Sequence, residues 1–192
     1  MDHTTREHIH ALHGTDPNLR YTSFLYIINL TQQPVDWAYE VWDDMLALLQ
    51  SKDNHQRSIA VQVLSNLTKS DPEKRMLKDF DQLFVVTKDE KFVTARHSLQ
   101  SLWMVGVVNE DLKKKVVDQL SKRFHECISE KNCTLIRYDI LEVFRKIYDQ
   151  TADEKLKDKA LGLIEQEDDP KYKKKYSALW KQTLTSARQK KS

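Results

Sequence analysis

The chain has 192 residues, of which only 3 are glycine and 4 are proline, and its formal net charge is +2. β-Sandwiches and barrels need a turn signal about every 8 to 12 residues, and dinucleotide-binding or P-loop folds need clustered glycines, so we exclude both classes. Charged residues make up 31% of the chain and hydrophobic residues 40%, which is too apolar for a disordered chain and too polar for a thick globular core. These values predict a thin, all-helical body.

Amphipathic segments and helix start signals predict ten helices in five pairs. The first helix of each pair is expected at Thr5–His13 or in the segments opened by Pro34, Asp71-Pro72, Asn109 and Thr151. Proline suits the first helical turn because an N–H there has no intrahelical partner, and Thr151 with Glu154 has the spacing of a capping box. The second helices are expected to begin close to Asp16, Asp53, Asp89, Asn132 and Asp169.

An internal repeat organises these segments. The stretch that begins at Asp16 matches the stretch that begins at Asp53 with a constant offset of 37, so that Arg20 matches Arg57. Counted from the arginine, apolar residues return at +4, +7 and +10, which is the spacing of one helix face. The same register follows Arg137, and looser copies start near Ala95 and Asp169.

This repeat resembles the HEAT and armadillo class of α-solenoids, in which helical pairs of about 36 to 42 residues stack and the second helix opens as Asp-Pro-x-x-Arg. The best matches are Asp16, Pro17, Arg20 and Arg57, together with Arg137 ahead of Phe144; the third copy departs from the pattern with Ala95 at the arginine position. The resemblance implies a right-handed α-α superhelix of about five HEAT-like pairs. We expect one repeat domain over 1–187 and a basic, disordered tail over 188–192.

The second helices supply the candidate contact residues. Arg20 and Arg57 are expected to pair with acids of neighbouring turns and thereby to tie one repeat to the next. On the second helices, positions outside the apolar stripe hold Tyr26, an amphipathic ring suited to an interface, and one asparagine per repeat. The asparagines could form a ladder toward a ligand backbone or could cap their own helices. The candidate partner-binding residues are therefore Tyr26, Asn29, Asn66, Arg20, Arg57 and Arg137.

Positive charge is concentrated at the end of the sequence. Residues 171–192 hold eight basic groups and no acid, whereas residues 1–170 carry a net charge of −6. A basic helix can neutralise phosphates, but a basic helix end also suits the helix dipole and a terminal repeat needs a polar face. Both interpretations stay open, and the candidate nucleic-acid contacts are Lys171, Lys173, Lys174 and Lys175.

The remaining reactive residues form no recognisable catalytic or metal site. Cys127 and Cys133 are six residues apart, without the paired spacing of a zinc site, and we interpret them as free thiols. The histidines near the start, which include His10 and His13 on one helix face, have no acid or cysteine at a spacing that would complete a metal shell. We expect no metal and no cofactor.

The four tryptophans lie near the apolar stripes, and packing between repeats accounts for them. Trp42, followed by Asp43 and Asp44, is the one local candidate for the aromatic and acidic pair with which DNA alkylation repair glycosylases, also built from HEAT-like repeats, meet damaged DNA.

We therefore expect a non-catalytic, monomeric scaffold whose concave helical surface binds an extended protein or peptide partner. The alternative is a nucleic-acid-binding or DNA-alkylation-repair-like protein, which would place basic side chains of several repeats along one track. The sequence has no stretch of 18 apolar residues and no apolar segment after its first charges, so a cytoplasmic location without membrane contact is expected.

Overall fold

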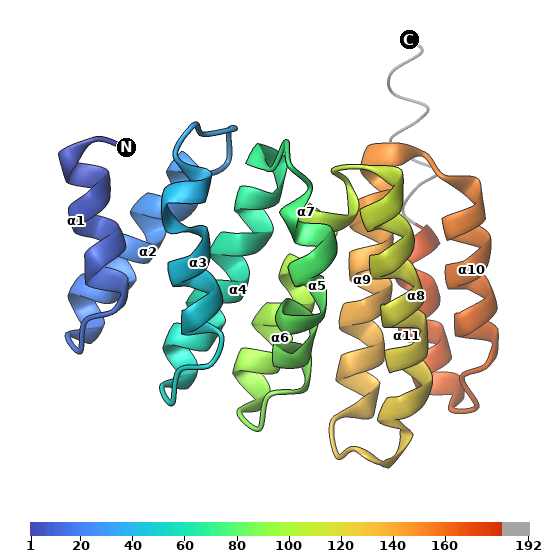
Figure 1. Cartoon of the computed structure of the whole chain (residues 1–192). Helices are drawn as coiled ribbons and strands as arrows, with labels where there is room; N and C mark the ends of the chain where they lie inside the picture. Colours follow the sequence, from blue (N-terminus) through green and yellow to red (C-terminus); the bar gives the residue numbers. More distant parts are fainter. Residues whose placement is uncertain (182–192) are drawn as a thin grey trace, which may run out of the picture. The chain divides into compact units, whose positions relative to one another are not determined.

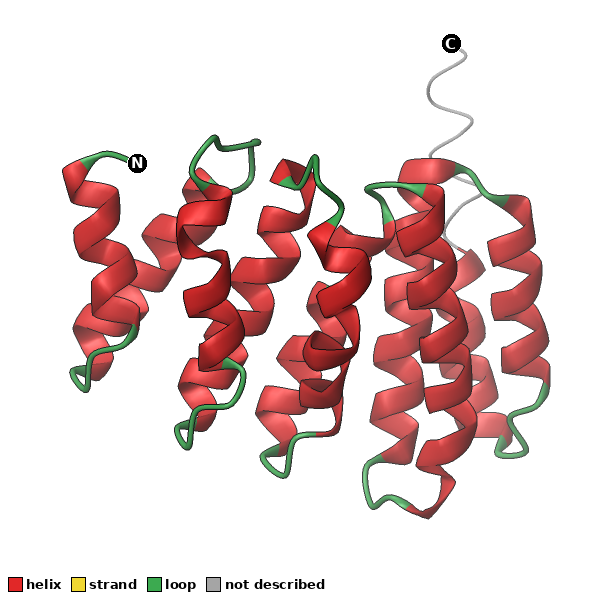
Figure 2. Cartoon of the chain, viewed as in Figure 1, coloured by secondary structure: helices red, strands yellow, loops and turns green. Residues whose placement is uncertain are grey.

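The computed structural model describes residues 1–181, and the expected tail over 188–192, with the last residues of the expected repeat domain, lies outside them. The described residues contain helices and loops and no strand, so the prediction of an all-α chain is confirmed (Figure 1, Figure 2). The ten longer helices are α1 His3–Leu12, α2 Pro17–Leu30, α3 Ala38–Leu48, α4 Asn54–Leu67, α5 Arg75–Val85, α6 Phe92–Ser101, α8 Glu110–Glu126, α9 Cys133–Thr151, α10 Glu154–Glu165 and α11 Pro170–Lys181. The short elements are helix α7 Trp103–Gly106 and the 3₁₀ turns η1 Thr68–Ser70, η2 Val86–Lys88 and η3 Cys127–Ser129.

The second helices begin where aspartate caps were expected. The Asp16 carboxylate accepts hydrogen bonds from the Asn18 and Leu19 backbone N–H groups, and the Asp53 carboxylate accepts one from His55. These bonds satisfy N–H groups that have no carbonyl partner inside the first helical turn. Helices α2, α4, α9 and α11 start within one residue of the expected positions, and α6 starts three residues after Asp89.

Several first helices begin later than expected. Helix α3 starts four residues after Pro34 and α5 three residues after Pro72, so neither proline occupies the first helical position. The capping box expected at Thr151 is wrong, because α9 continues through Thr151 and its hydroxyl donates to the Ile147 carbonyl. The chain then turns at Ala152, which has a left-handed conformation with φ 52°, and Asp153 caps α10.

The chain divides into two compact units, Met1–Lys113 and the part that starts at Lys114. In the first unit, α1 packs on α2, α3 on α4 and α5 on α6, while α2, α4 and α6 contact one another in series. Figure 1 shows α1, α3 and α5 as one layer, with α2, α4 and α6 behind them. The unit is thus a two-layer stack. Each of α2, α4 and α6 has one face that the layer of α1, α3 and α5 does not cover.

The apolar stripes of the second helices form the core. The +4, +7 and +10 positions after Arg57 are Val61, Leu64 and Leu67, and all three are fully buried. The corresponding residues after α6 begins are Leu99 of α6, Leu102 between the helices and Val105 of α7, and they are equally buried. The periodicity therefore identified the packed face of these helices correctly.

In the second unit, α9 packs against both α10 and α11. Contrary to the expectation of free thiols, Cys127 and Cys133 form a disulfide with a Cα–Cα distance of 5.1 Å. The physical reason is local: η3 ends α8 and the following loop returns at once to the start of α9, which brings the two thiols together.

Candidate binding groove

Three arginines join consecutive second helices in the same way. Arg20 of α2 donates from Nη1 to Asp53 Oδ2 at 2.7 Å, and Arg57 of α4 donates from Nε to Asp89 Oδ2 at 2.6 Å. The second unit repeats the pattern, with Arg137 Nη1 donating to Glu167 Oε2 at 2.9 Å. The ion pairs predicted for Arg20 and Arg57 are confirmed. Both guanidinium groups therefore bind acids of the chain itself.

Each acceptor carboxylate also binds a backbone N–H group at or just before the start of the next second helix: Asp53 caps α4, Asp89 accepts from Lys91 before α6, and Glu167 accepts from Asp169 before α11. Each pair therefore aligns two helix starts. Burial by itself would raise the pKa of the Asp53 carboxyl, but the His55 backbone N–H and the Arg20 guanidinium lower the pKa below its ordinary value. The pKa of Asp89 is lowered in the same way by Arg57 and the Lys91 N–H against the effect of burial. Both carboxylates thus stay charged and hold α2, α4 and α6 in register.

With α2, α4 and α6 held in register, one face of α4 lies between α2 on one side and α6 on the other. The residues on that face recur every three or four positions, as expected for a single helical stripe. They are His55, Ser58, Ile59, Gln62 and Asn66, and Lys69 of η1 continues the stripe beyond the helix end. The wall on the α2 side is a matching stripe of Pro17, Tyr21, Phe24, Leu25 and Ile28, continued by Gln32 after the helix ends.

The stripes enclose two adjoining cavities. The first, about 540 Å³, lies toward the helix starts, with His97 of α6 on its far side. The second, about 470 Å³, lies toward the helix ends, with Trp103 and Met104 of α7 on its far side. Gln62 lines both cavities, so they form one groove, which we call the α4 groove.

The floor of the α4 groove carries neutral amides. Gln62 Nε2 donates to the Ser58 carbonyl at 3.1 Å, and Asn66 Nδ2 donates to the Gln62 carbonyl at 3.1 Å. Gln62 Nε2 also donates to Ser58 Oγ at 3.2 Å, so both of its N–H groups have acceptors on α4, whereas Asn66 uses one of its two N–H groups. The second N–H of Asn66 and the oxygens of both amides remain for a ligand.

The structure brings only part of the predicted contact set into this groove. Asn66 and Arg20 line it, but Tyr26 stacks on His8 of α1 with ring centroids 4.0 Å apart, and Asn29 is exposed outside it. The aromatic and apolar wall instead contains Tyr21 and Leu25, whose exposed fractions are 61% and 47%. Their i, i+4 spacing on α2 places both on one helix face, but that spacing alone does not show which neighbour the face meets.

The four lysines of α11 do not share one face. Lys173 ion-pairs with Glu165 at 2.9 Å, and Lys175 lies 4.7 Å from the centroid of the Tyr138 ring. Successive helical residues are rotated by about 100°, so Lys173 lies about 200° around the helix from Lys171, whereas Lys174 and Lys175, three and four residues on, share the face of Lys171. Lys171 lies over the Tyr172 ring, and Lys174 is exposed.

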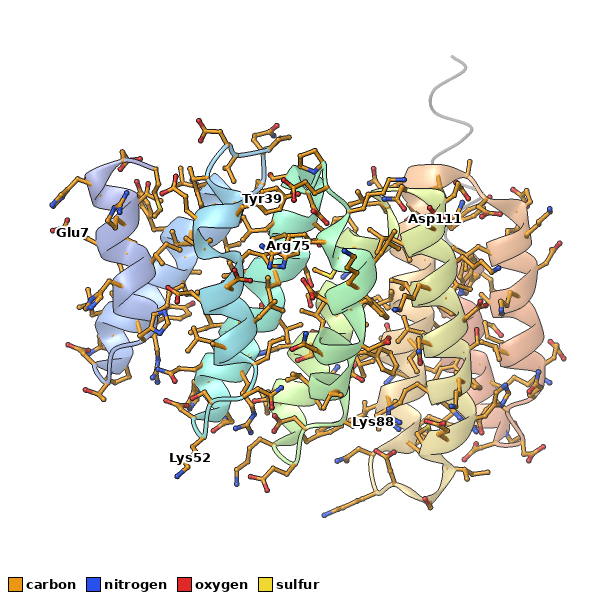
Figure 3. All side chains as sticks on the ribbon, viewed as in Figure 1. Glu7, Tyr39, Lys52, Arg75, Lys88 and Asp111 are labelled. Carbon is orange, nitrogen blue, oxygen red and sulfur yellow. A yellow bond between two sulfur atoms is a disulfide. The ribbon has the colours of Figure 1, made fainter. Side chains whose placement is uncertain are left out.

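Trp42 belongs to the packing of the first-helix layer. Its side chain is fully buried, and its Nε1 donates to Asp79 Oδ2 of α5 at 2.9 Å. Arg75 pairs with Asp43 and lies over the Tyr39 and Trp42 rings, and Figure 3 shows Tyr39 and Arg75 between α3 and α5. A base cannot reach a ring that is buried in this way, so the candidate aromatic and acidic pair does not form a surface site, and Trp42 packs as expected.

Residues 1–181 contain no group of three or more histidine, cysteine or acidic side chains placed to hold a metal ion. Within the same range, no helix combines the length and the apolar character needed to cross a membrane.

Comparisons with known proteins were made by sequence and by structure. No family model matches the chain, and no curated protein matches it. Among solved structures, the chain is similar to one described as an engineered protein of a structural genomics consortium, with 16% identity and a TM-score of 0.48. That likeness covers 97% of this chain and 90% of the other.

Proposed function

We propose that the chain is an α-solenoid of the HEAT or armadillo kind and serves as a non-catalytic scaffold that binds an extended segment of a partner protein in the α4 groove. The sequence offset of 37 supports the solenoid, as does the repetition of the arginine pairs along the second helices. In such stacks the second helices provide a long, rigid contact surface.

The observation that carries the proposal is the continuity of the two cavities along α4. Helix α4 has 14 residues and is therefore about 21 Å long, enough for about six residues of extended chain. A compact ligand would need only one of the two cavities, whereas an extended polypeptide contacts both.

The chemistry of the lining fits a polypeptide. Tyr21, Leu25 and Trp103 offer aromatic and apolar surface for side chains, while the amides of Gln62 and Asn66 can pair with backbone N–H and C=O groups. Backbone groups that lose water need such partners, because an unsatisfied buried group costs about 1 to 3 kcal/mol. In the lining, Ser58 Oγ lies 3.2 Å from His97 Nδ1, but none of the residues that line the two cavities is acidic, so no carboxylate completes a Ser-His-acid triad there.

A random dodecapeptide phage library panned on the purified chain tests the proposal. We expect selected peptides to bind the wild-type chain and to lose about tenfold or more in affinity for Gln62→Trp, because an indole at the shared residue fills the groove. The matched control is Gln82→Trp, which puts the same side chain on an exposed position of α5.

Circular dichroism and thermal unfolding establish that both variants fold. Peptides that bind the wild type and both variants equally well would show that binding occurs elsewhere and would overturn the proposal. Failure to select any peptide would overturn it too.

A further inference from the structure

Lys69 is the positively charged side chain at the end of the α4 groove that lacks an acidic partner. Its Nζ donates to the carbonyls of Thr31 at 3.0 Å and Gln32 at 3.1 Å, where α2 ends. No carboxylate within residues 1–181 forms an ion pair with it, in contrast to Arg20, which lines the other cavity and is paired with Asp53. An ammonium group has three N–H donors, so one donor and most of the charge remain.

The surroundings of Lys69 are apolar or neutral. Trp103 and Met104 line the cavity beside it, together with the amides of Asn66 and Gln62. Burial lowers the pKa of the Lys69 ammonium, and no neighbouring acid offsets this effect. A carboxylate that reaches the Lys69 Nζ can accept a charge-assisted hydrogen bond, which is about twice as strong as one between neutral groups.

A further cavity extends the groove beyond Lys69. It measures about 240 Å³ and is lined by Lys69, Trp103, Met104, Val107 and Val108. Apart from the lysine, every lining residue is apolar or aromatic. This cavity suits one large apolar side chain.

We propose that Lys69 receives the side-chain carboxylate of an aspartate or glutamate in the bound segment, and that the adjacent partner residue places a large apolar side chain against Trp103, Met104, Val107 and Val108. The inference rests on the proposed function and specifies the partner: an extended peptide with an acidic residue next to a large apolar one. None of the residues that line the three cavities is acidic, so nothing in this part of the described chain repels that carboxylate.

The carboxylate belongs to a side chain within the segment and not to the end of a chain. The groove continues on both sides of Lys69, toward Gln62 in one direction and toward Val107 and Val108 in the other. A terminal carboxylate at Lys69 would leave one of these directions empty.

The test pans the same dodecapeptide library separately on the wild-type chain and on Lys69→Met, Lys69→Arg and Lys52→Met. Lys52 is an exposed lysine in the loop before α4, as Figure 3 shows, and its replacement changes the net charge equally at the opposite end of that helix. The best wild-type peptide is then measured against its Asp→Asn or Glu→Gln counterpart by fluorescence anisotropy.

We expect enrichment of an acid next to a large apolar residue on the wild type, on Lys69→Arg and on Lys52→Met, and loss of the acid preference on Lys69→Met. Neutralising the acid should weaken binding to the wild type about tenfold or more, and should change binding to Lys69→Met little. The arginine variant keeps both the charge and the donors, so retained preference there shows that a cation at this position is sufficient. Unchanged binding of the neutralised peptide to Lys69→Met shows that the end of α2 is not disturbed by the exchange.

The outcomes separate the two proposals. Peptides that are blocked by Gln62→Trp but show no acid preference overturn the role of Lys69 and leave the groove as a binding site. An acid preference that survives in Lys69→Met also overturns it. If no peptide depends on Gln62, the binding function itself fails, and the role of Lys69 fails with it.

Discussion

Arg57 holds Asp89 with two hydrogen bonds, from Nε to Oδ2 at 2.6 Å and from Nη2 to Oδ1 at 2.9 Å. The same guanidinium donates from Nη1 to the Ser51 carbonyl at 2.8 Å. One side chain of α4 therefore fixes the loop before α4 and the segment that leads into α6. The side chain of Asp89 is only 4% exposed, whereas that of Asp53, which Arg20 holds, is 36% exposed.

This difference in exposure predicts unequal costs for the two arginines. Arg57→Met leaves a buried carboxylate without its partner and should lower the free energy of unfolding by about 3 kcal/mol. Arg20→Met leaves a carboxylate that water can reach and should cost about 1 kcal/mol. Urea unfolding followed by circular dichroism measures both, with Lys78→Met on the exposed side of α5 as the control. Equal costs for the two variants would contradict the assignment of Asp89 as the buried partner.

The same pairs predict a fall in stability in acid. Because the pKa values of Asp53 and Asp89 are lowered in the folded chain, the unfolded chain binds more protons between the folded and unfolded pKa values. Their contribution is complete above the ordinary aspartate pKa of about 4 and is lost as the pH falls through the lowered values. Urea unfolding between about pH 6 and pH 2 should show a smaller acid loss for Arg57→Met than for the wild type. Parallel curves for the two proteins would be evidence against this linkage.

The repeat made the arginine pairs predictable, because it places an arginine four residues after each of Asp16 and Asp53 and an acid shortly before the next second helix. It could not identify the groove residues. Tyr21 and Leu25 occupy exposed positions of α2 that a single helix does not distinguish from solvent-facing ones, and only the neighbouring α4 and α6 turn them into a wall. Lys69 is equally hidden from sequence reasoning, since its partners are carbonyl groups of Thr31 and Gln32, which every residue type possesses.

The bond between Trp42 and Asp79 predicts a measurable coupling between α3 and α5. Trp42→Phe keeps most of the ring volume but removes the indole N–H, so we expect a loss of about 2 kcal/mol. In the background of Asp79→Ala the same exchange should cost about 1 kcal/mol less, because the bond is already absent. A double-mutant cycle by urea unfolding measures this difference and cancels the effect of the altered ring. Additive costs would mean that the indole N–H contributes nothing through Asp79.

The disulfide between Cys127 and Cys133 predicts that a reducing agent destabilises the second unit. The bond closes a short loop that contains Glu130, and Glu130 Oε2 accepts a hydrogen bond from Nη2 of the buried Arg123 at 2.7 Å. Closing a loop of this size removes unfolded-state entropy worth about 2 kcal/mol, and the open loop also allows Glu130 to leave the arginine. Thermal unfolding with and without a phosphine reductant should therefore show a lower Tm for the reduced wild type.

Cys127→Ala combined with Cys133→Ala supplies the control, because a chain without these thiols has no bond to reduce. We expect its Tm to be independent of the reductant and close to that of the reduced wild type. Arg57→Met, which alters the other unit, should keep the full response of the wild type to reduction, because Arg57 has no part in the Glu130 loop. A wild-type Tm that is the same in both conditions would show that the disulfide does not hold this loop in solution.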